Sequence, residues 1–272
     1  MSLSINISFP ADGVGLIAFS DPPMNFGSAE LASGLTNAID QVREANARVA
    51  VLASDTPGYF IAHWSLQFII DRQRALAADG NRVPPTSRRI FDAVAATPLI
   101  TIAVNNGQAW GGGAELSWAC DLRIAADSAT YGQPEVGLGI IPGAGGTTRL
   151  ARLIGPTKCF EMIVDGRPIS AAEALSLGAI NKVVPDSELR DAAIAWAAHI
   201  AHWPTWALEG CKRSFRQGLE LDGEAAARNE SQIFFDLAGR SDSLDLLKQA
   251  QARYRQGQDS YDAIGLPRSE QG

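Results

Sequence analysis

Alternating and helical apolar patterns divide the first two thirds of the chain into short strands and helices. Ser4–Phe9 and Val14–Phe19 carry strand patterns on either side of Ala11-Asp12-Gly13, which predicts a β-hairpin. Ser28–Asn46 is predicted to be a helix because its apolar residues recur on one face. That face carries Leu31, Leu35, Ile39 and Val42. Further strands are predicted at Val49–Ser54, Leu99–Val104, Leu122–Ala126, Ala129–Tyr131 and Ile180–Val184, helices at Ser65–Ala78, Arg88–Ala96 and Gly112–Cys120, and a loop at Asn81–Thr86.

From Gly143 onward the pattern is mostly helical. Ser170-Ala171-Ala172-Glu173 is a capping box that starts a helix, and Gly178 is a suitable stop. The remaining helices are predicted at Asp186–His202, Thr205–Gly218, Gly223–Ala238 and Ser241–Tyr254. Their bulky apolar residues must pack on the core or on another subunit. The pattern therefore predicts an α/β core over residues 1–200 and a helical region over residues 201–272, for which the family resemblance described below implies a role in oligomerisation.

Composition and charge exclude several classes of protein. Of the 272 residues, 46% are hydrophobic, which is enough for one large core. The formal net charge of −7 argues against a nucleic-acid-binding protein, which usually carries a basic patch. Cys120, Cys159 and Cys211 form no CxxC pair, so they predict reduced thiols and neither a disulfide framework nor a zinc site. No basic leader and no apolar run of about 20 residues is found, which predicts a cytoplasmic protein without a membrane span.

Two glutamates lie in the most glycine-rich part of the chain. Glu115 follows Gly111-Gly112-Gly113, where the absence of Cβ atoms lets a ligand oxygen approach the N–H groups at the start of a helix. Glu135 lies in Gly132-Gln133-Pro134-Glu135, in a predicted loop. Taken singly, each feature has a simpler explanation. The glycines are typical of tight strand–helix packing, a carboxylate such as Glu115 is stabilised by the dipole at the start of a helix, and Glu135 can be an ordinary acid in a surface loop. Together they predict a site for acid–base chemistry.

The glycine segments do not match the common nucleotide-binding motifs. GxGxxG is absent from this stretch, and Gly143-Ala144-Gly145-Gly146-Thr147-Thr148 lacks the lysine of a P-loop. The chain also lacks the G-x-S-x-G elbow of a Ser/His/Asp hydrolase. The chemistry is therefore sought at the two glutamates.

Three long motifs resemble those of the enoyl-CoA hydratase/isomerase (crotonase) family. The first is NGQAWGGGAEL from Asn106 to Leu116, followed by Cys120-Asp121. The second joins Gly132-Gln133-Pro134-Glu135 to LGIIPGAGGT, residues 138–147. The third covers residues 166–174 and 178–184. These motifs are in register with the family pattern, and the resemblance covers most of residues 5–260.

The resemblance implies both a fold and a substrate class. The fold is a ClpP/crotonase-like α/β spiral of ββα units, followed by C-terminal helices that form a homotrimer, commonly as a dimer of trimers. The substrate is an acyl-CoA thioester. Coenzyme A enters as part of that substrate, and no separate cofactor and no metal is implied.

The resemblance also implies roles for individual residues. The backbone N–H groups of Trp64 and Gly112 match an oxyanion hole, which stabilises the enolate formed from a thioester. Glu115 matches the base that activates the water attacking C3, and Glu135 matches the proton source for C2. This pair implies hydration of a 2-enoyl-CoA to a 3-hydroxyacyl-CoA, because the family's isomerases typically keep only the second glutamate. The helix dipole is expected to keep Glu115 ionised. Further substrate contacts are implied at Ala62, His63, Trp110, Gly111 and Gly143.

One segment departs from the family pattern. The chain has Ala62-His63-Trp64-Ser65 where the family usually has Ala-Gly-x-Asp. His63 can be interpreted as an additional acid–base group, as a hydrogen-bond partner of a polar acyl group, or as a packed loop residue. Trp64 and Trp110 fit either stacking on an aromatic acyl group or packing alone. The alternatives are an enoyl-CoA isomerase, an aromatic hydroxyacyl-CoA hydratase-lyase, a dehydratase, and a catalytically idle acyl-CoA-binding protein.

Overall fold

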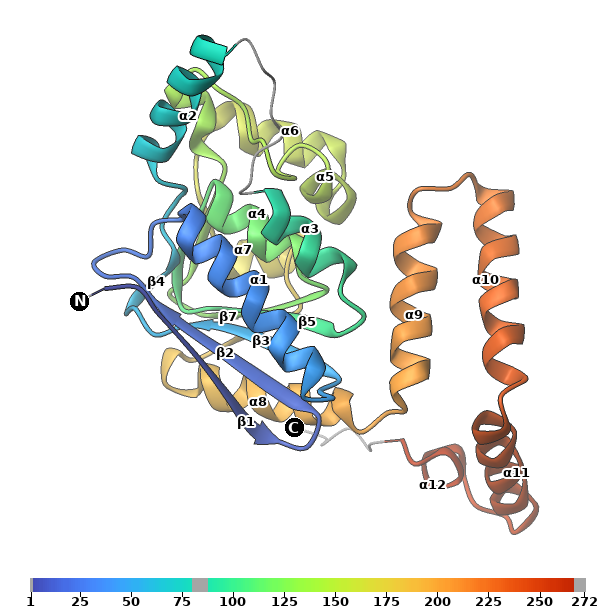
Figure 1. Cartoon of the computed structure of the whole chain (residues 1–272). Coiled ribbons are helices and arrows are strands. Elements are labelled where there is room, and N and C mark those ends of the chain that lie inside the picture. The colour runs from blue at the N-terminus through green and yellow to red at the C-terminus, as the bar shows by residue number, and fades with distance from the viewer. Residues whose placement is uncertain (1, 80–87, 267–272) are drawn as a thin grey trace. The chain divides into compact units, whose positions relative to one another are not determined.

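The strands form two sheets, both within residues 1–205. The computed structural model describes residues 2–79 and 88–266, and the predicted loop Asn81–Thr86 lies outside them (Figure 1). The large sheet consists, in spatial order, of β1 (Ser4–Ala11), β2 (Val14–Ser20), β3 (Val49–Ser54), β5 (Ile100–Asn105), β7 (Leu122–Ala126) and β10 (Lys182–Val184). The small sheet consists, in spatial order, of β4 (Gly58–Ile61), β6 (Gly107–Trp110), β8 (Thr130–Gly132) and β9 (Ile169–Ser170).

Neighbouring strands run parallel except at one edge of each sheet. β1 pairs antiparallel with β2, and Ala11 lies opposite Val14, so the predicted hairpin is confirmed. Gly13 closes its turn with a φ of 70°, a conformation that favours glycine. At the edge of the small sheet, β9 pairs antiparallel with β8. The remaining neighbours are parallel and are therefore joined by crossover connections.

The chain alternates between the two sheets in a repeated unit. β3 enters the large sheet, β4 enters the small sheet, and α2 (Leu66–Asp79) follows; β5, β6 and α4 (Gly112–Ala119) repeat this order. β7 and β8 repeat it again and lead into the 3-10 helix η1 (Pro134–Leu138). This is the succession of ββα units that the resemblance implies. The apolar pattern did not predict β4 and β6 because each has only four residues and begins with glycine.

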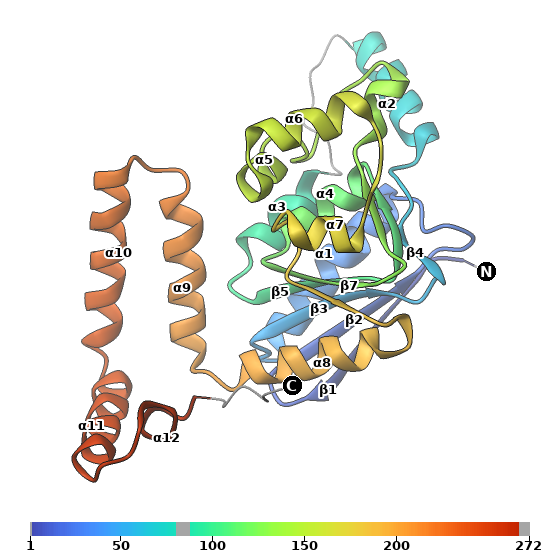
Figure 2. The same cartoon turned by 180° about the vertical axis from the view of Figure 1, so that it is seen from behind.

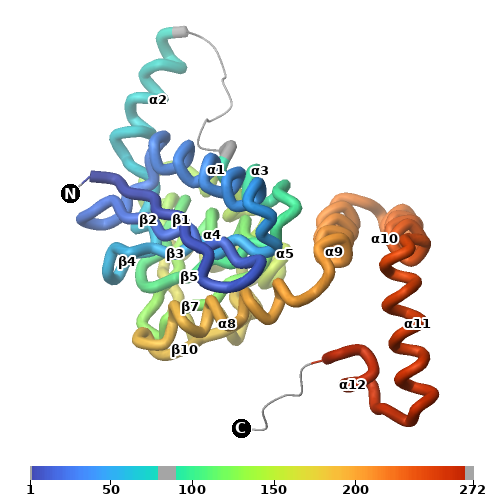
Figure 3. Tube along the Cα trace, turned by 60° about the horizontal axis from the view of Figure 1, so that its bottom comes forward, coloured from blue at the N-terminus to red at the C-terminus, as the bar shows by residue number. Residues whose placement is uncertain are grey.

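Helices cover both faces of the large sheet. α1 (Ala29–Glu44) contacts β1 and β2, and α8 (Leu189–Ala201) contacts β2, β3, β5 and β7 from the opposite face (Figures 2 and 3). The four residues predicted on the apolar face of α1 are all buried. Ser28 Oγ caps this helix by accepting the Leu31 N–H at 3.0 Å, so the predicted start of the helix is confirmed.

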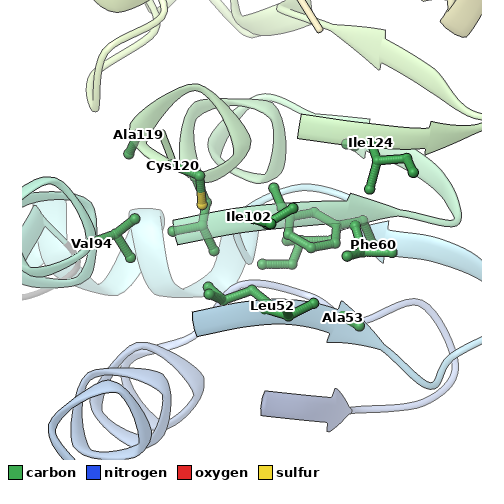
Figure 4. Close-up of a cluster of buried hydrophobic side chains, with 14 of the residues drawn as sticks. Leu52, Ala53, Phe60, Val94, Ile102, Ala119, Cys120 and Ile124 are labelled. Carbon is green, nitrogen blue, oxygen red and sulfur yellow. The ribbon is translucent and has the colours of Figure 1, made fainter. Parts of the chain in front are cut away.

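A hydrophobic cluster joins the large sheet to the small one. Leu52 of β3, Ile102 of β5 and Ile124 of β7 lie with Phe60 of β4 in this cluster (Figure 4). Val94 of α3 (Arg88–Ala96) belongs to the same cluster. Full burial of such a side chain stabilises a fold by roughly 1.5–3 kcal/mol. The cluster therefore holds β4, and the loop that follows it, firmly against β3 and β5.

The capping signals near residue 170 are confirmed. Ser170 Oγ accepts the Glu173 N–H at 3.2 Å at the start of α7 (Ala171–Ser176). Gly178 lies two residues beyond that helix with a φ of 75°, a conformation in which glycine avoids the Cβ clash of other residues. The chain then passes into β10, which starts two residues later than predicted.

Apart from shifts of one or two residues at helix ends, the helices differ from the prediction in two places. The helix predicted at Asp186–His202 begins as a 3-10 turn, η2 (Asp186–Glu188), because the Glu188 N–H donates to the Pro185 carbonyl three residues earlier. α8 starts only at Leu189. The helical stretch after Gly143 contains α5 (Arg149–Ile154) and α6 (Pro156–Asp165), which Gly155 and Pro156 separate.

Residues 206–272 form a second compact unit, of which 206–266 are described. Its helices are α9 (Thr205–Gly218), α10 (Gly223–Ala238), α11 (Ser241–Arg255) and the short α12 (Ser260–Ile264), which was not predicted. α9 and α10 lie side by side in opposite directions (Figures 1 and 2). Gly210 permits this packing, since a Cβ there would lie 2.4 Å from Leu237 Cδ1. Three aromatic side chains of the unit, Phe215, Phe234 and Phe235, are 66%, 61% and 69% exposed.

Candidate active site

Three consecutive glycines bring different groups close to the start of α4. A Cβ on Gly111 would lie 2.8 Å from Glu135 Oε1, and one on Gly112 would lie 2.6 Å from Trp64 Cε3. A Cβ on Gly113 would lie 2.1 Å from the Ile61 carbonyl oxygen. The triplet therefore serves tight packing, as one of the two interpretations of the sequence expected.

Gly113→Ala is expected to lower the free energy of unfolding by about 1–3 kcal/mol, because the new methyl group would overlap a backbone carbonyl that cannot rotate away. Urea denaturation of the two proteins measures this difference. Gly223→Ala is the matched control, since no atom lies within 4 Å of a Cβ at that position. Equal stability of Gly113→Ala and the unmodified protein would mean that α4 does not depend on this close approach.

Glu115 lies in the first turn of α4 and is only 3% exposed. Its Oε1 accepts the Ala144 N–H at 2.6 Å and the Gly146 N–H at 2.9 Å. Burial raises the pKa of Glu115, whereas these two N–H groups and the charge of Arg149 lower it. Burial has the largest effect on this pKa, and the N–H groups of the segment from Ala144 to Gly146 provide the main opposition to it.

Glu135 lies in the first turn of η1, directly after Pro134, and is half-buried. Its carboxyl reaches back to Gly111, at the start of α4. Its pKa is raised to about 7, chiefly by burial and to a smaller extent by the charge of Glu115. The interpretation of Glu135 as a surface loop acid is therefore wrong. The short helix turns the side chain inward, and no periodicity in the sequence could have indicated this.

The two carboxyls form an electrostatically coupled pair, since the charge of Glu115 acts on Glu135. Two like charges in a buried site are costly, so the pair is expected to hold one proton near neutral pH. The N–H groups on Glu115 Oε1 can only donate, which favours the charged form of that carboxyl. The hydrogen-bond donors around Glu115 therefore favour placing the negative charge of the pair on Glu115 and its proton on Glu135.

The loop after β4 lies against the same glycines. The Gly27 N–H donates to the His63 carbonyl at 2.9 Å, and the Gly27 carbonyl accepts the Ser65 N–H at 2.9 Å. In this parallel bridge the N–H of Trp64 points away from Gly27. Gly112 is the first residue of α4, so its N–H has no acceptor within the helix. Two backbone donors, at Trp64 and Gly112, are thus available in neighbouring segments.

The side chains of His63 and Trp64 pack within this loop. His63 Nδ1 donates to the Trp64 carbonyl at 2.8 Å, and its ring lies 4.8 Å from that of Phe26. The Trp64 indole is 8% exposed and lies over Gly27, where a Cβ would come within 2.2 Å of it. Its centroid is 5.3 Å from that of Phe91. Both side chains therefore have packing partners, as the simpler interpretation of each expected.

The other predicted substrate-binding residues are Ala62, Trp110 and Gly143, and their polar groups have different partners. The Ala62 carbonyl accepts the Gln108 side-chain amide at 3.2 Å. Trp110 directs its indole N–H to Thr130 Oγ1 at 3.1 Å, so its polar edge faces β8. Gly143 is exposed and immediately precedes the Ala144 N–H that binds Glu115. The structure thus brings Glu115, Glu135, Gly111, Gly112 and Trp64 together, and it places the polar edge of Trp110 elsewhere.

Two parts of the site were not assigned from the sequence. The first is the pair of N–H groups of Ala144 and Gly146, which bind Glu115 although they lie 29 and 31 residues away along the chain. The available signal in the sequence was Gly145, which the structure places at a φ of 133°. Gln133 is fully buried beside Glu135, and its place in the motif Gln133-Pro134-Glu135 was the available signal.

In the described part of the chain, no three His, Cys, Asp or Glu side chains gather as a metal site would require. The helices described there are also too short or too polar to cross a membrane.

Comparisons with known proteins identify the family of the chain. The family model described as enoyl-CoA hydratase/isomerase matches residues 10–254. The chain is 35% identical over 217 residues to "Probable enoyl-CoA hydratase 2, mitochondrial" from Arabidopsis thaliana, covering 79% of this chain and 71% of the relative. It is 37% identical over 195 residues to the glyoxysomal fatty acid beta-oxidation multifunctional protein MFP-a from Brassica napus, covering 72% of this chain but 27% of that protein.

Solved structures show the same fold. The crystal structure of enoyl-CoA hydratase from Bacillus anthracis superposes with a TM-score of 0.83 and 34% sequence identity. The superposition covers 92% of this chain and 96% of that one. The predicted crotonase fold is therefore confirmed, with its two sheets and repeated ββα units. From the family model and the relatives together, the chain belongs to the enoyl-CoA hydratase/isomerase (crotonase) family.

Proposed function

We propose that this protein is an enoyl-CoA hydratase, which adds water in syn fashion to a 2-enoyl-CoA thioester and forms a 3-hydroxyacyl-CoA. The observation that carries the proposal is the coupled pair of Glu115 and Glu135 at the glycine-rich start of α4. Hydratases are also the proteins that the chain resembles in sequence and structure. The presence of both carboxyls favours hydration over migration of a double bond.

The backbone donors of Trp64 and Gly112 provide the electrostatic part of the mechanism. Attack on C3 pushes electrons through C2 onto the thioester oxygen, where negative charge develops. Two N–H groups held by packed segments stabilise that charge without having to reorganise, and loss of one such donor typically costs about 2.7–4 kcal/mol. The close approach of the Trp64 loop to Gly112 supports this role.

The two carboxyls provide the proton transfers. Glu115, which is suited to the charged form, removes a proton from water as the water oxygen bonds to C3. Glu135, which holds its proton up to about neutral pH, gives that proton to C2 as the enolate collapses. One proton enters the pair and one leaves it. The pair therefore ends with its charge moved from Glu115 to Glu135, and transfer between the carboxyls, directly or through water, restores the starting state.

The direct test is incubation with crotonoyl-CoA and with longer or aromatic 2-enoyl-CoA thioesters. Loss of absorbance at the conjugated thioester band, with a product heavier by one water, is the expected result. A product of unchanged mass would identify an isomerase, and release of acetyl-CoA would identify a hydratase-lyase. Binding of these thioesters without turnover would contradict the proposal and favour an acyl-CoA-binding protein.

We further propose that residues 201–272 form the oligomer interface of a trimer or a dimer of trimers. The exposed aromatic side chains of α9 and α10 support this, because clusters of large apolar side chains are rarely left in water. Phe234→Ser combined with Phe235→Ser is expected to reduce the mass of the particle to that of one chain. Sedimentation equilibrium measures this mass, with Glu224→Ser on the same helix as the control. A trimer that survives both changes would place the interface elsewhere.

A further inference from the structure

An arginine binds the short segment whose N–H groups hold Glu115. Arg149 is the first residue of α5, and its backbone N–H donates to the Gly145 carbonyl at 2.7 Å. Its side chain turns back over the same segment, where Nη1 donates to the Ala144 carbonyl at 2.7 Å. The peptide unit between Gly145 and Gly146 is thus bound on both sides, since its carbonyl accepts from Arg149 and its N–H donates to Glu115.

The other end of the guanidinium is bound by a different helix. Nη2 of Arg149 lies 3.5 Å from Asp92 Oδ1 on α3, a helix that packs against α4. A guanidinium is planar and holds its donors at fixed angles, so partners at both ends set its orientation. The arginine side chain is 22% exposed, which limits the screening of its charge by water. Arg149 therefore links α3 to the segment that holds Glu115.

The positive charge of Arg149 also acts on Glu115 itself. Burial raises the pKa of this carboxyl, and the arginine lowers it together with the N–H groups of the segment. Glu135 of η1 is the acid that is coupled to Glu115. Of the other elements that contact α4, α3 places Asp92 beside the guanidinium, and the fully described strands β4 and β6 carry no acidic or basic side chain. The charge of Arg149 thus favours the anion of Glu115.

The packing at Gly145 leaves little room for another arrangement of this segment. A Cβ on Gly145 would lie 2.8 Å from Arg149 Nη1 and 3.2 Å from its Cδ, so the arginine lies directly against the glycine. A Cβ on Gly146 would lie 2.5 Å from Pro142 Cβ. Loss of the arginine would therefore open a space on one side of the segment and allow its N–H groups to turn away from Glu115.

We propose that Arg149 is a positioning residue for the hydration reaction, which holds Glu115 in place through the segment from Ala144 to Gly146 and in its charged form through its own positive charge. The inference rests on the proposed function, since Glu115 is the proposed base for the attacking water. A base must point at that water and must be ionised to take its proton. Arg149 bonds to backbone carbonyls and to Asp92, so it acts on the reaction through Glu115.

Arg149→Met and Arg149→Lys separate the two effects. Methionine keeps an apolar stem and removes the charge and the side-chain donors, so we expect kcat for crotonoyl-CoA to fall roughly 10- to 100-fold with little change in KM. The decline of kcat at low pH should also move to higher pH, because Glu115 loses a charge that favours its anion. Lysine keeps the charge but not the planar fork. It should leave the low-pH decline near its original position while restoring only part of kcat.

Arg152→Met is the matched control, since it makes the same change three residues later on α5, at an exposed position. It should leave kcat and its pH dependence unchanged. A folded Arg149→Met with unchanged kcat and pH dependence would overturn the proposal. A fall in kcat without any movement of the low-pH decline would also overturn it, because a loss of structure alone does not change the ionisation of the base.

Asp92→Asn provides a second variant in case Arg149→Met does not fold. It removes the carboxylate that shares the charge of Arg149 and leaves the arginine bound to the Ala144 carbonyl. The low-pH decline of kcat should then move in the opposite direction, to lower pH, because a negative charge has been removed from beside the arginine. The shift should be small, since the Asp92 side chain is 57% exposed and its charge is screened. An unchanged or higher position of the decline would contradict the proposal.

Infrared titration of the protein without substrate distinguishes failure of this inference from failure of the proposed function. The carboxylate stretch that disappears in Glu115→Gln reports the ionisation of Glu115. It should develop at higher pH in Arg149→Met than in the unmodified protein or in Arg149→Lys. If no 2-enoyl-CoA is hydrated, the proposed function fails, whereas this shift would still support the effect of Arg149 on Glu115. If hydration proceeds and the stretch develops at the same pH in Arg149→Met, the role of Arg149 is refuted.

Discussion

Glu115→Gln is expected to lower kcat for hydration of crotonoyl-CoA by about 10²- to 10⁴-fold, the usual contribution of a general base. The amide has the size of the carboxyl but cannot remove a proton from water. Its oxygen can still accept the Ala144 and Gly146 N–H groups, which lie 2.6 Å and 2.9 Å from Oε1. The segment around residue 145 should therefore stay in place, and the loss should appear in turnover and not in folding.

Steady-state kinetics at the conjugated thioester band, together with a thermal melt, measure both effects. Glu44→Gln, at the exposed end of α1, makes the same chemical change far along the sequence from the site and should leave kcat unchanged. A Glu115→Gln protein that hydrates crotonoyl-CoA at the unmodified rate would remove Glu115 from the mechanism. It would also leave the hydratase proposal without its base.

Glu135→Gln is expected to cause a loss of similar size, about 10²- to 10⁴-fold, because C2 then has no acidic group in reach. The pH dependence should change in a characteristic way. In the unmodified protein, kcat for hydration should decline as pH rises through about 7, the pKa at which Glu135 loses its proton. The residual activity of Glu135→Gln should lack that decline. A decline that persists in the variant would assign it to another group.

The same carboxyl should affect stability in a direction that can be worked out from its pKa. Glu135 has a pKa of about 7 in the folded protein against an ordinary value of 4.5, so the folded state binds the proton more tightly. Its contribution to stability is fully present below pH 4.5 and is lost as pH rises through about 7. Glu135→Gln should remove this dependence and be the more stable protein above pH 7. Denaturation at pH 6 and pH 8 tests the sign of the difference.

The long, regular elements of the fold follow from local pattern. The predicted α1 lies within two residues of its observed ends, and β3 and α3 have their predicted bounds. The two helices show apolar residues that recur on one face, and β3 is a continuous apolar run, so each pattern can be recognised in the sequence. β4 and β6 were missed although they hold the loop of Trp64 and the start of α4. Four residues are too few to show a period, and their register is set by pairing with each other across 49 residues, as at Gly58 and Gly107.

The motifs alone singled out the residues that we propose carry the chemistry, since the spacing of Glu115, Glu135 and the glycine triplet matches the family pattern. Their environment could not be inferred in this way. Whether a carboxyl is charged depends on burial and on donors that come from distant parts of the chain, such as the N–H groups of Ala144 and Gly146 around Glu115. The raised pKa of Glu135 likewise arises only when η1 packs against the start of α4. Spacing along a chain records which groups are present, whereas desolvation and hydrogen-bond direction exist only once the chain is packed.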